Sequence, residues 1–137
     1  MIHFKHMKII FAILASGATF TLLDYIWLAH IMKGFYLEKL APFVDIKNGS
    51  LVVNMPAAIV FYLIALFSVY FFVVRNAADM WTAAWTGALL GFCMYAFYDF
   101  TNLATLKDYP TSLAIIDTAW GTFLVGCVSV VMFWVLS

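Results

Sequence analysis

Long stretches without charge alternate with short polar segments along this chain. The charge-free stretches lie between Lys8 and Asp24, between Lys47 and Arg75, between Asp79 and Asp99, and after Asp117. A helix needs about 20 mostly apolar residues to cross the roughly 30 Å hydrocarbon core of a bilayer. The pattern therefore predicts four membrane-spanning helices in a single transmembrane domain over residues 1–137, near 8–32, 52–74, 80–106 and 111–136.

The segments between these helices are short or amphipathic. Pro56 and Pro110 fall at or before the first turn of a predicted helix, where a missing N–H costs little. Residues 75–79 form so short a connection that the second and third helices should be antiparallel neighbours. Segment 34–50 mixes aromatic with charged residues, so we expect it to lie in the membrane interface; the alternative is a solvated loop.

The first apolar stretch follows two lysines, Lys5 and Lys8, as a secretory signal peptide would. However, the stretch continues past any cleavage point made of small residues, so we expect a retained helix. An even number of spans places both termini on one side. Lysine and arginine are divided too evenly between the two sides to give the orientation.

Composition places the chain among integral membrane proteins of the all-α class. Hydrophobic residues make up 66% and charged residues 10% of the 137 residues, and the mean hydropathy is +1.03. A soluble domain is about 45–50% apolar and about 25% charged. The formal net charge is zero with no basic run, which argues against nucleic acid as a partner. Cys93 and Cys127 lie in apolar runs without the spacing of a metal site.

Two segments of the chain resemble each other. Residues 24–31 (DYIWLAHI) and 99–106 (DFTNLATL) share an aspartate, an aromatic residue and a Leu-Ala pair, and a lysine follows each. We interpret this as a duplicated helical hairpin in which both copies run in the same direction. The four-helix bundle would then consist of two parallel repeats, with the first and third helices beside the repeat axis.

Three aspartates are predicted to lie at a similar depth. Asp24 precedes Lys33 by nine residues and Asp99 precedes Lys107 by eight, which is ~12–13 Å along a helix. Asp117 follows Asp108 by nine residues on a helix of opposite direction, again ~13 Å. All three should therefore converge in a polar chamber inside the bundle.

The chamber is the candidate binding site for a ligand or ion. An aspartate near the bilayer centre costs roughly 2.5–3.5 kcal/mol, so it should face the bundle interior. Lys107 and His30 are the nearest basic residues at the rim. The candidate residues are Asp24, Asp99, Asn102, Asp117, Tyr98, Trp120, Trp27 and Lys107. The alternative is that the aspartates only join helices and the aromatic residues only pack. No catalytic residue, metal site or cofactor is assigned.

The polar segments also resemble a known family. They are Asp24-Tyr-Ile-Trp27, Tyr98-Asp-Phe-Thr-Asn-Leu-Ala-Thr105, Lys107-Asp-Tyr-Pro110 and Asp117-Thr-Ala-Trp-Gly121. Together they resemble small bacterial four-span membrane proteins catalogued as a domain of unknown function, DUF2177. The resemblance implies a four-helix, multi-pass protein of the bacterial cytoplasmic (inner) membrane. It carries no activity over to this chain.

Three classes of function fit these observations. The favoured one is binding or transport of a small cation, a proton or a polar amine-bearing ligand in the aspartate chamber. The second is a membrane-embedded enzyme that uses paired carboxyls for acid–base chemistry on a lipid or isoprenoid. The third is a non-catalytic accessory or sensor subunit. The expected partners are the lipid bilayer and a small molecule, ion or lipid, and the sequence leaves oligomer formation open.

Overall fold

The computed structural model describes residues 2–137, with side chains from His6 onward, and it is almost entirely helical. The elements follow in the order α1 (Ile2–Ile26), η1 (Trp27–Ile31), α2 (Lys33–Leu40), β1 (Ile46–Lys47), β2 (Ser50–Leu51), α3 (Met55–Ser68), η2 (Val69–Val73), η3 (Val74–Asn76), α4 (Met80–Thr105) and α5 (Thr111–Leu136). The segments η1 and η2 are π-helical turns that continue α1 and α3. The predicted all-α class is confirmed.

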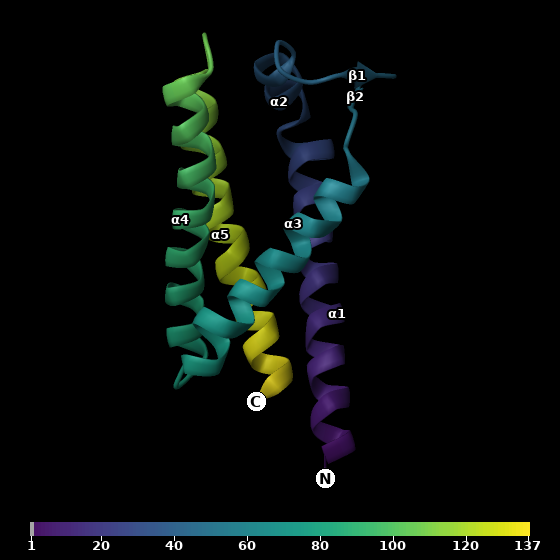
Figure 1. Cartoon of the computed structure of the whole chain (residues 1–137), viewed down its shortest axis with the longest axis vertical. Helices are drawn as coiled ribbons and strands as arrows, with labels where there is room; N and C mark the ends of the chain where they lie inside the picture. Colours follow the sequence, from purple (N-terminus) through teal and green to yellow (C-terminus); the bar gives the residue numbers. More distant parts are fainter. Residues whose placement is uncertain (1) are drawn as a thin grey trace.

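Three helical segments in the described part of the chain are long and apolar enough to cross a membrane: His6–Ile31, Met55–Asn76 and Thr111–Leu136. Helix α4 has 26 residues, which is also sufficient length. It is less apolar because tryptophan, tyrosine, threonine and glycine are interspersed among its aliphatic residues. In Figure 1 the four long helices alternate in direction, and both termini lie at the same end as the connection between η3 and α4.

Polar side chains and prolines mark where α3 and α4 begin. The Asn54 side chain accepts a hydrogen bond from the Ala57 N–H at 3.2 Å, and Pro56 lies in the first turn of α3. Asp79 accepts one from the Thr82 N–H at 2.7 Å. Both are N-caps that satisfy a backbone donor left free at the helix start. The hydrogen bonds from Thr82 lower the pKa of Asp79.

Helices α4 and α5 pack against each other over most of their length (Figure 1). Glycines make this close approach feasible. A Cβ atom on Gly91 would overlap the carbonyl oxygen of Gly121, and one on Gly121 would overlap the Tyr95 ring. The α4–α5 pair is therefore the tightest helix–helix contact of the fold.

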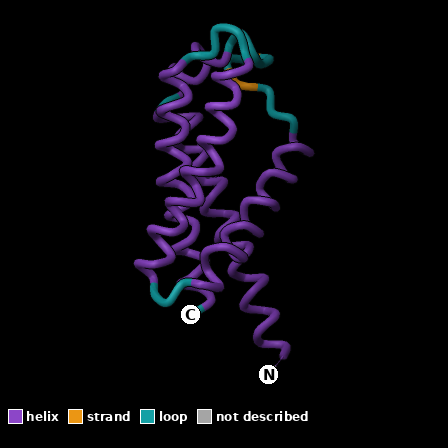
Figure 2. The backbone as a smooth tube through the Cα atoms, turned by 60° about the vertical axis from the view of Figure 1, so that its left-hand side comes forward, coloured by secondary structure: helices purple, strands orange, loops and turns teal. Residues whose placement is uncertain are grey.

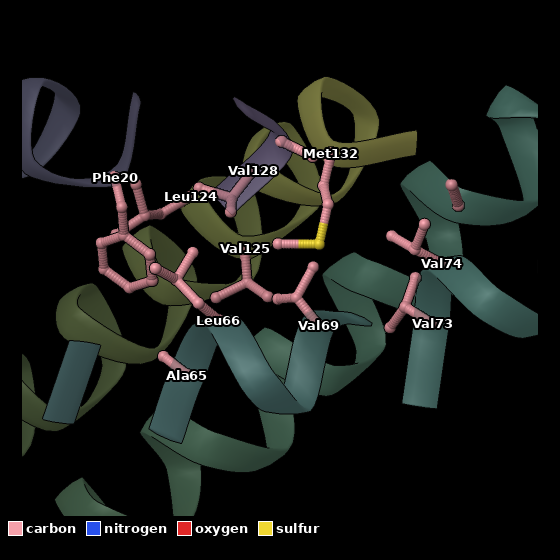
Figure 3. Close-up of a cluster of buried hydrophobic side chains, with 12 residues drawn as sticks. Phe20, Ala65, Leu66, Val69, Val73, Val74, Leu124, Val125, Val128 and Met132 are labelled. Carbon is pink, nitrogen blue, oxygen red and sulfur yellow. The ribbon is translucent and has the colours of Figure 1, made fainter. Parts of the chain in front are cut away.

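Helix α3 runs obliquely across the other helices (Figure 1). Leu66 near its end, and Val69 and Val73 of the following η2 turn, belong to the apolar core together with Phe20 of α1 and Val125 of α5 (Figure 3). The N-terminal half of α3 diverges from the remaining helices, as Figure 2 shows. This divergence leaves space between α3 and α4 at the end of the bundle that carries α2.

The neighbour of α1 differs from the one that the repeat suggested. The first and third long helices, α1 and α4, were expected to adjoin, but α1 packs mainly along α5 and makes few contacts with α3. The first hairpin is thus open, whereas the second is closed. The small residues that close α4 onto α5 have no equivalent set between α1 and α3.

Segment 34–50 folds over one end of the bundle. Helix α2 buries the side chain of Tyr36. Strands β1 and β2, of two residues each, then form a hairpin. Asn48 and Gly49 at its turn have φ values of 51° and 68°, the left-handed conformation that an Asn-Gly turn adopts readily. The segment therefore forms a folded cap, and its position in the membrane interface stays a prediction.

Replacing Gly91 by alanine should destabilise the protein, because the added methyl group meets the α5 backbone, which cannot rotate away. We expect a loss of about 1–3 kcal/mol in the free energy of unfolding, measured by detergent-induced unfolding. Gly34→Ala is the matched control, since nothing lies within 4 Å of its added methyl group. Equal stability of the two variants would contradict the close α4–α5 contact.

The arrangement also predicts which segments share a membrane side. In a background lacking Cys93 and Cys127, single cysteines at Lys47, Ala77 and Lys107 would be labelled by an impermeant thiol reagent from one side of sealed vesicles. We expect Lys47→Cys and Lys107→Cys to react together and Ala77→Cys to react from the opposite side. Joint labelling of positions 47 and 77 would rule out the four-pass arrangement.

Candidate functional site

Asp99 and Asp117 form a pair of acidic side chains between α4 and α5. Their carboxyl groups are close enough to share a hydrogen bond. The Tyr109 hydroxyl donates to Oδ1 of Asp99 at 3.0 Å, and the Tyr36 hydroxyl donates to Oδ1 of Asp117 at 2.5 Å. Trp27 in turn donates its indole N–H to the Tyr36 oxygen at 3.1 Å. The pair is therefore held by donors from two separate connections of the chain, and Trp27 supports one of these donors.

Asp99 is the most deeply buried acidic residue among those described. Its exposed fraction is 0%, and its second carboxyl oxygen, Oδ2, has no hydrogen-bond donor among the described residues. A buried carboxylate oxygen without a donor is costly. The neighbouring carboxyl of Asp117 can relieve this cost if one of the two groups is protonated and donates to the other.

Asp24 has a separate set of donors on the other side of the site. The Trp120 indole N–H donates to its Oδ1 at 2.9 Å, and the Tyr62 hydroxyl donates to its Oδ2 at 3.1 Å. The rings of Trp27 and Trp120 stack with centroids 4.4 Å apart and an interplanar angle of 1°. This stack connects the Asp24 network with the Asp99–Asp117 network, so side chains from α1, α3, α4 and α5 meet in one site.

Tyr36 and Tyr109 remain neutral donors in this environment. Burial, together with the nearby Asp117 carboxyl, raises the pKa of Tyr36 above its ordinary value. Burial also raises the pKa of Tyr109, and the Asp99 carboxyl adds to the effect. Both hydroxyls therefore keep their protons at physiological pH and can donate to carboxylates.

A cavity of about 460 Å³ adjoins the acidic residues. Its walls come from α1, the α2–β2 cap, α3, α4 and α5, and they are mostly apolar or aromatic. The lining residues are Asp24, Leu28, Tyr36, Leu40, Leu51, Phe61, Met94, Tyr95, Tyr98, Tyr109, Leu113, Asp117 and Trp120. Asp24 and Asp117 are the acidic residues in this lining, and it contains no lysine, arginine or histidine. Asp99 is fully buried and is not part of this lining.

The cavity lies where α3 and α4 diverge. Phe61 of α3 and Tyr98 of α4 flank it and are exposed by 41% and 63%. A second cavity of about 470 Å³ lies between α1, the cap and α3 and shares Asp24, Leu28, Tyr36 and Leu51 with the first. These shared residues form the wall between the two spaces.

A family model described as a predicted membrane protein (DUF2177) matches residues 9–134. The chain belongs to this family. No curated protein and no solved structure matches the chain. The family resemblance expected from the sequence is thus confirmed, and it covers α1 from its second turn to nearly the end of α5.

The sequence-predicted residues of this DUF2177 protein divide into three groups. Asp24, Asp99, Asp117, Trp27 and Trp120 belong to the hydrogen-bonded site, and Asn102 lies beside the Tyr109 hydroxyl. Tyr98 lies at the cavity edge with its side chain largely exposed. Lys107 and His30 are exposed, and neither forms an ion pair with an aspartate within the described residues.

Sequence reasoning missed the role of Tyr36 in the DUF2177 site. The residue lies in a segment that was interpreted as interfacial, and the fold brings it to Asp117, 81 positions away in the chain. In the sequence, Tyr36 is only one tyrosine among several aromatic residues of that segment. Tyr62 and Tyr109, which donate to Asp24 and Asp99, are likewise absent from the predicted site residues.

Tyr36→Phe should destabilise this DUF2177 protein, because Asp117 loses a donor and Trp27 loses an acceptor. We expect a loss of about 1.5–3 kcal/mol in the free energy of unfolding, the usual range for a hydrogen bond to a charged group. Tyr25→Phe removes the same hydroxyl from an exposed side chain that makes no hydrogen bond among the described residues, and it should have no effect. Equal stability of both variants would show that the Tyr36 hydroxyl is not structurally important.

Proposed function

We propose that this membrane protein binds a small amphipathic molecule with a positively charged head group in the cavity of about 460 Å³. The head group lies against Asp24 and Asp117, and the apolar part lies along the wall formed by α3 and α4. The observation that carries this proposal is the combination of two carboxyl groups with an aromatic, otherwise apolar lining. In this proposal the protein is a single transmembrane domain in the bacterial cytoplasmic membrane, as the family resemblance suggests.

The charge balance of the site supports a cationic ligand. The only salt bridge among the described residues joins Lys39 to Glu38 in α2, and neither residue lines the cavity. The carboxyl groups therefore have neutral donors but no positive partner. A bound cation would supply the missing charge in surroundings where electrostatic interactions are stronger than in water.

The aromatic lining supports the same ligand class. Tyr36, Tyr95, Tyr109 and Trp120 line the cavity together with the acidic residues. Aromatic faces attract cations by about 0.5–2 kcal/mol each, and quaternary ammonium groups are commonly held by several such rings. Aliphatic and aromatic walls also bind the apolar portion of a ligand by removing it from water.

The size and position of the cavity suit a ligand from the bilayer or its interface. Ligand sites commonly have volumes of about 300–1,000 Å³, and this cavity falls in the lower part of that range. Its edge between α3 and α4 is flanked by exposed aromatic side chains at Phe61 and Tyr98. An amphipathic molecule can reach such an edge without leaving the lipid.

A second candidate function is an enzyme acting on a lipid or isoprenoid. The adjacent Asp99 and Asp117 carboxyls favour it, because two carboxyls in different environments can divide the roles of acid and base. The accessory-subunit alternative would need the acidic residues only for joining helices. Ligand binding explains the cavity beside them, which helix joining does not.

Binding of benzyltrimethylammonium tests the proposal, because its fixed charge does not depend on pH. Binding is measured by calorimetry in nanodiscs of zwitterionic phosphatidylcholine. We expect wild type to bind the cation at least roughly tenfold more tightly than neopentylbenzene, its neutral isostere. Tenfold corresponds to about 1.4 kcal/mol. Asp117→Asn should weaken cation binding similarly. Asp45→Asn, the same change at an exposed site outside the cavity, is the matched control.

Two results would contradict the proposed function. One is equal affinity for the cation and its neutral isostere, which would reduce the site to an apolar pocket. The other is an Asp117→Asn variant that binds the cation as tightly as Asp45→Asn does.

A further inference from the structure

We propose that the Asp99–Asp117 pair holds a single proton when the cavity is empty and releases it when a cation binds against Asp117. This inference rests on the proposed function and adds its regulation: occupancy of the site is exchanged for a proton. It stands on three observations, namely the adjacent carboxyl groups, the buried oxygen of Asp99 without a donor, and the cavity that reaches Asp117 but not Asp99.

The geometry calls for one shared proton. Two adjacent carboxylates repel each other, and burial removes the water that would otherwise screen them. Tyr109 and Tyr36 each donate to one oxygen of the pair, which leaves Oδ2 of Asp99 unsatisfied. A proton between the two carboxyls satisfies that oxygen and removes the repulsion.

No positively charged side chain among the described residues pairs with the two carboxyls, although Lys33 lines the second cavity together with Asp24 and Tyr36. The titratable groups that face the pair are Tyr36 from α2, Tyr109 from the α4–α5 connection, Tyr95 from α4, Asp24 from α1 and, beyond Asp24, Tyr62 from α3. Tyr36, Tyr62 and Tyr109 are hydrogen-bond donors, and Asp24 adds further negative charge. Among the described residues no lysine, arginine or histidine forms an ion pair with these carboxyls.

The exchange conserves charge. With the cavity empty, the protonated pair carries one negative charge. When the cation lies against Asp117, both carboxyls can ionise, so the pair carries two negative charges and the ligand one positive charge. The O–H bond of the shared acid breaks, its electron pair stays on the carboxylate, and the proton passes to water in the cavity, which Asp117 lines directly.

The test is calorimetry with benzyltrimethylammonium in two buffers that differ in ionisation enthalpy. The probe carries no exchangeable proton, so any proton released comes from the protein. Wild type should release about one proton per cation near neutral pH, and its affinity should rise about tenfold per pH unit while the pair remains protonated. Asp99→Asn should release almost no protons and should lose this pH dependence, because the shared proton requires both carboxyl groups. Asp45→Asn should behave as wild type.

Infrared spectroscopy of the ligand-free protein provides a second measurement that needs no binding. The carbonyl band of a protonated carboxyl group should persist at neutral pH in wild type and be lost in both Asp99→Asn and Asp117→Asn. Absence of that band in wild type would overturn the shared proton even if a variant failed to fold. Cation binding without proton release would overturn the exchange alone, whereas absence of cation binding would overturn the proposed function and the exchange that rests on it.

Discussion

An acidic side chain on an apolar helix must find its hydrogen-bond donors within the protein, and much of this fold follows from that requirement. Asp24, Asp99 and Asp117 lie on three different helices, so their donors draw the helices and connections together. The donors are tyrosine and tryptophan rather than lysine or arginine. Such donors form hydrogen bonds to carboxyl oxygens without neutralising negative charge. The site is therefore hydrogen-bonded but has no positive side chain among the described residues to balance its carboxylates. The cap follows from the same requirement, since α2 must fold back for Tyr36 to reach Asp117.

The cavity arises from unequal packing among the long helices. Gly91 and Gly121 let α4 and α5 approach until no Cβ fits between them. Helix α3 lacks such a partner and crosses obliquely, so it contacts the core through its C-terminal turns and diverges at its start. A tight pair of helices thus holds Asp99 and Asp117 in fixed relation, while α3, which packs less closely, contributes Phe61 to the cavity lining. Closely and loosely packed helices coexist in the same small bundle.

The sequence predicted the parts of this arrangement that depend on local pattern. Charge-free stretches indicated the long helices, and the distances of Asp24, Asp99 and Asp117 from their flanking charges predicted that they belong to one site. It did not predict the neighbour of α1, because a repeat gives the direction of helices but not which faces pack. Lys107 was proposed for its sequence proximity to Asp99, yet the chain turns away at Leu106 and leaves the lysine exposed. Tyr36 could not be found, because its contact with Asp117 depends on the tertiary fold of the cap.

The stacked indoles of Trp27 and Trp120 give the site an optical property of its own. Trp120 contacts Trp27 with its face and Asp24 with its N–H, so its fluorescence depends on the position of α1 relative to α5 and on the carboxyl group it touches. The other three tryptophans, Trp81, Trp85 and Trp134, lie on exposed surfaces of α4 and α5. A spectral change that disappears when Trp120 is replaced by phenylalanine would therefore originate in the site, so changes at this site can be followed without an attached dye.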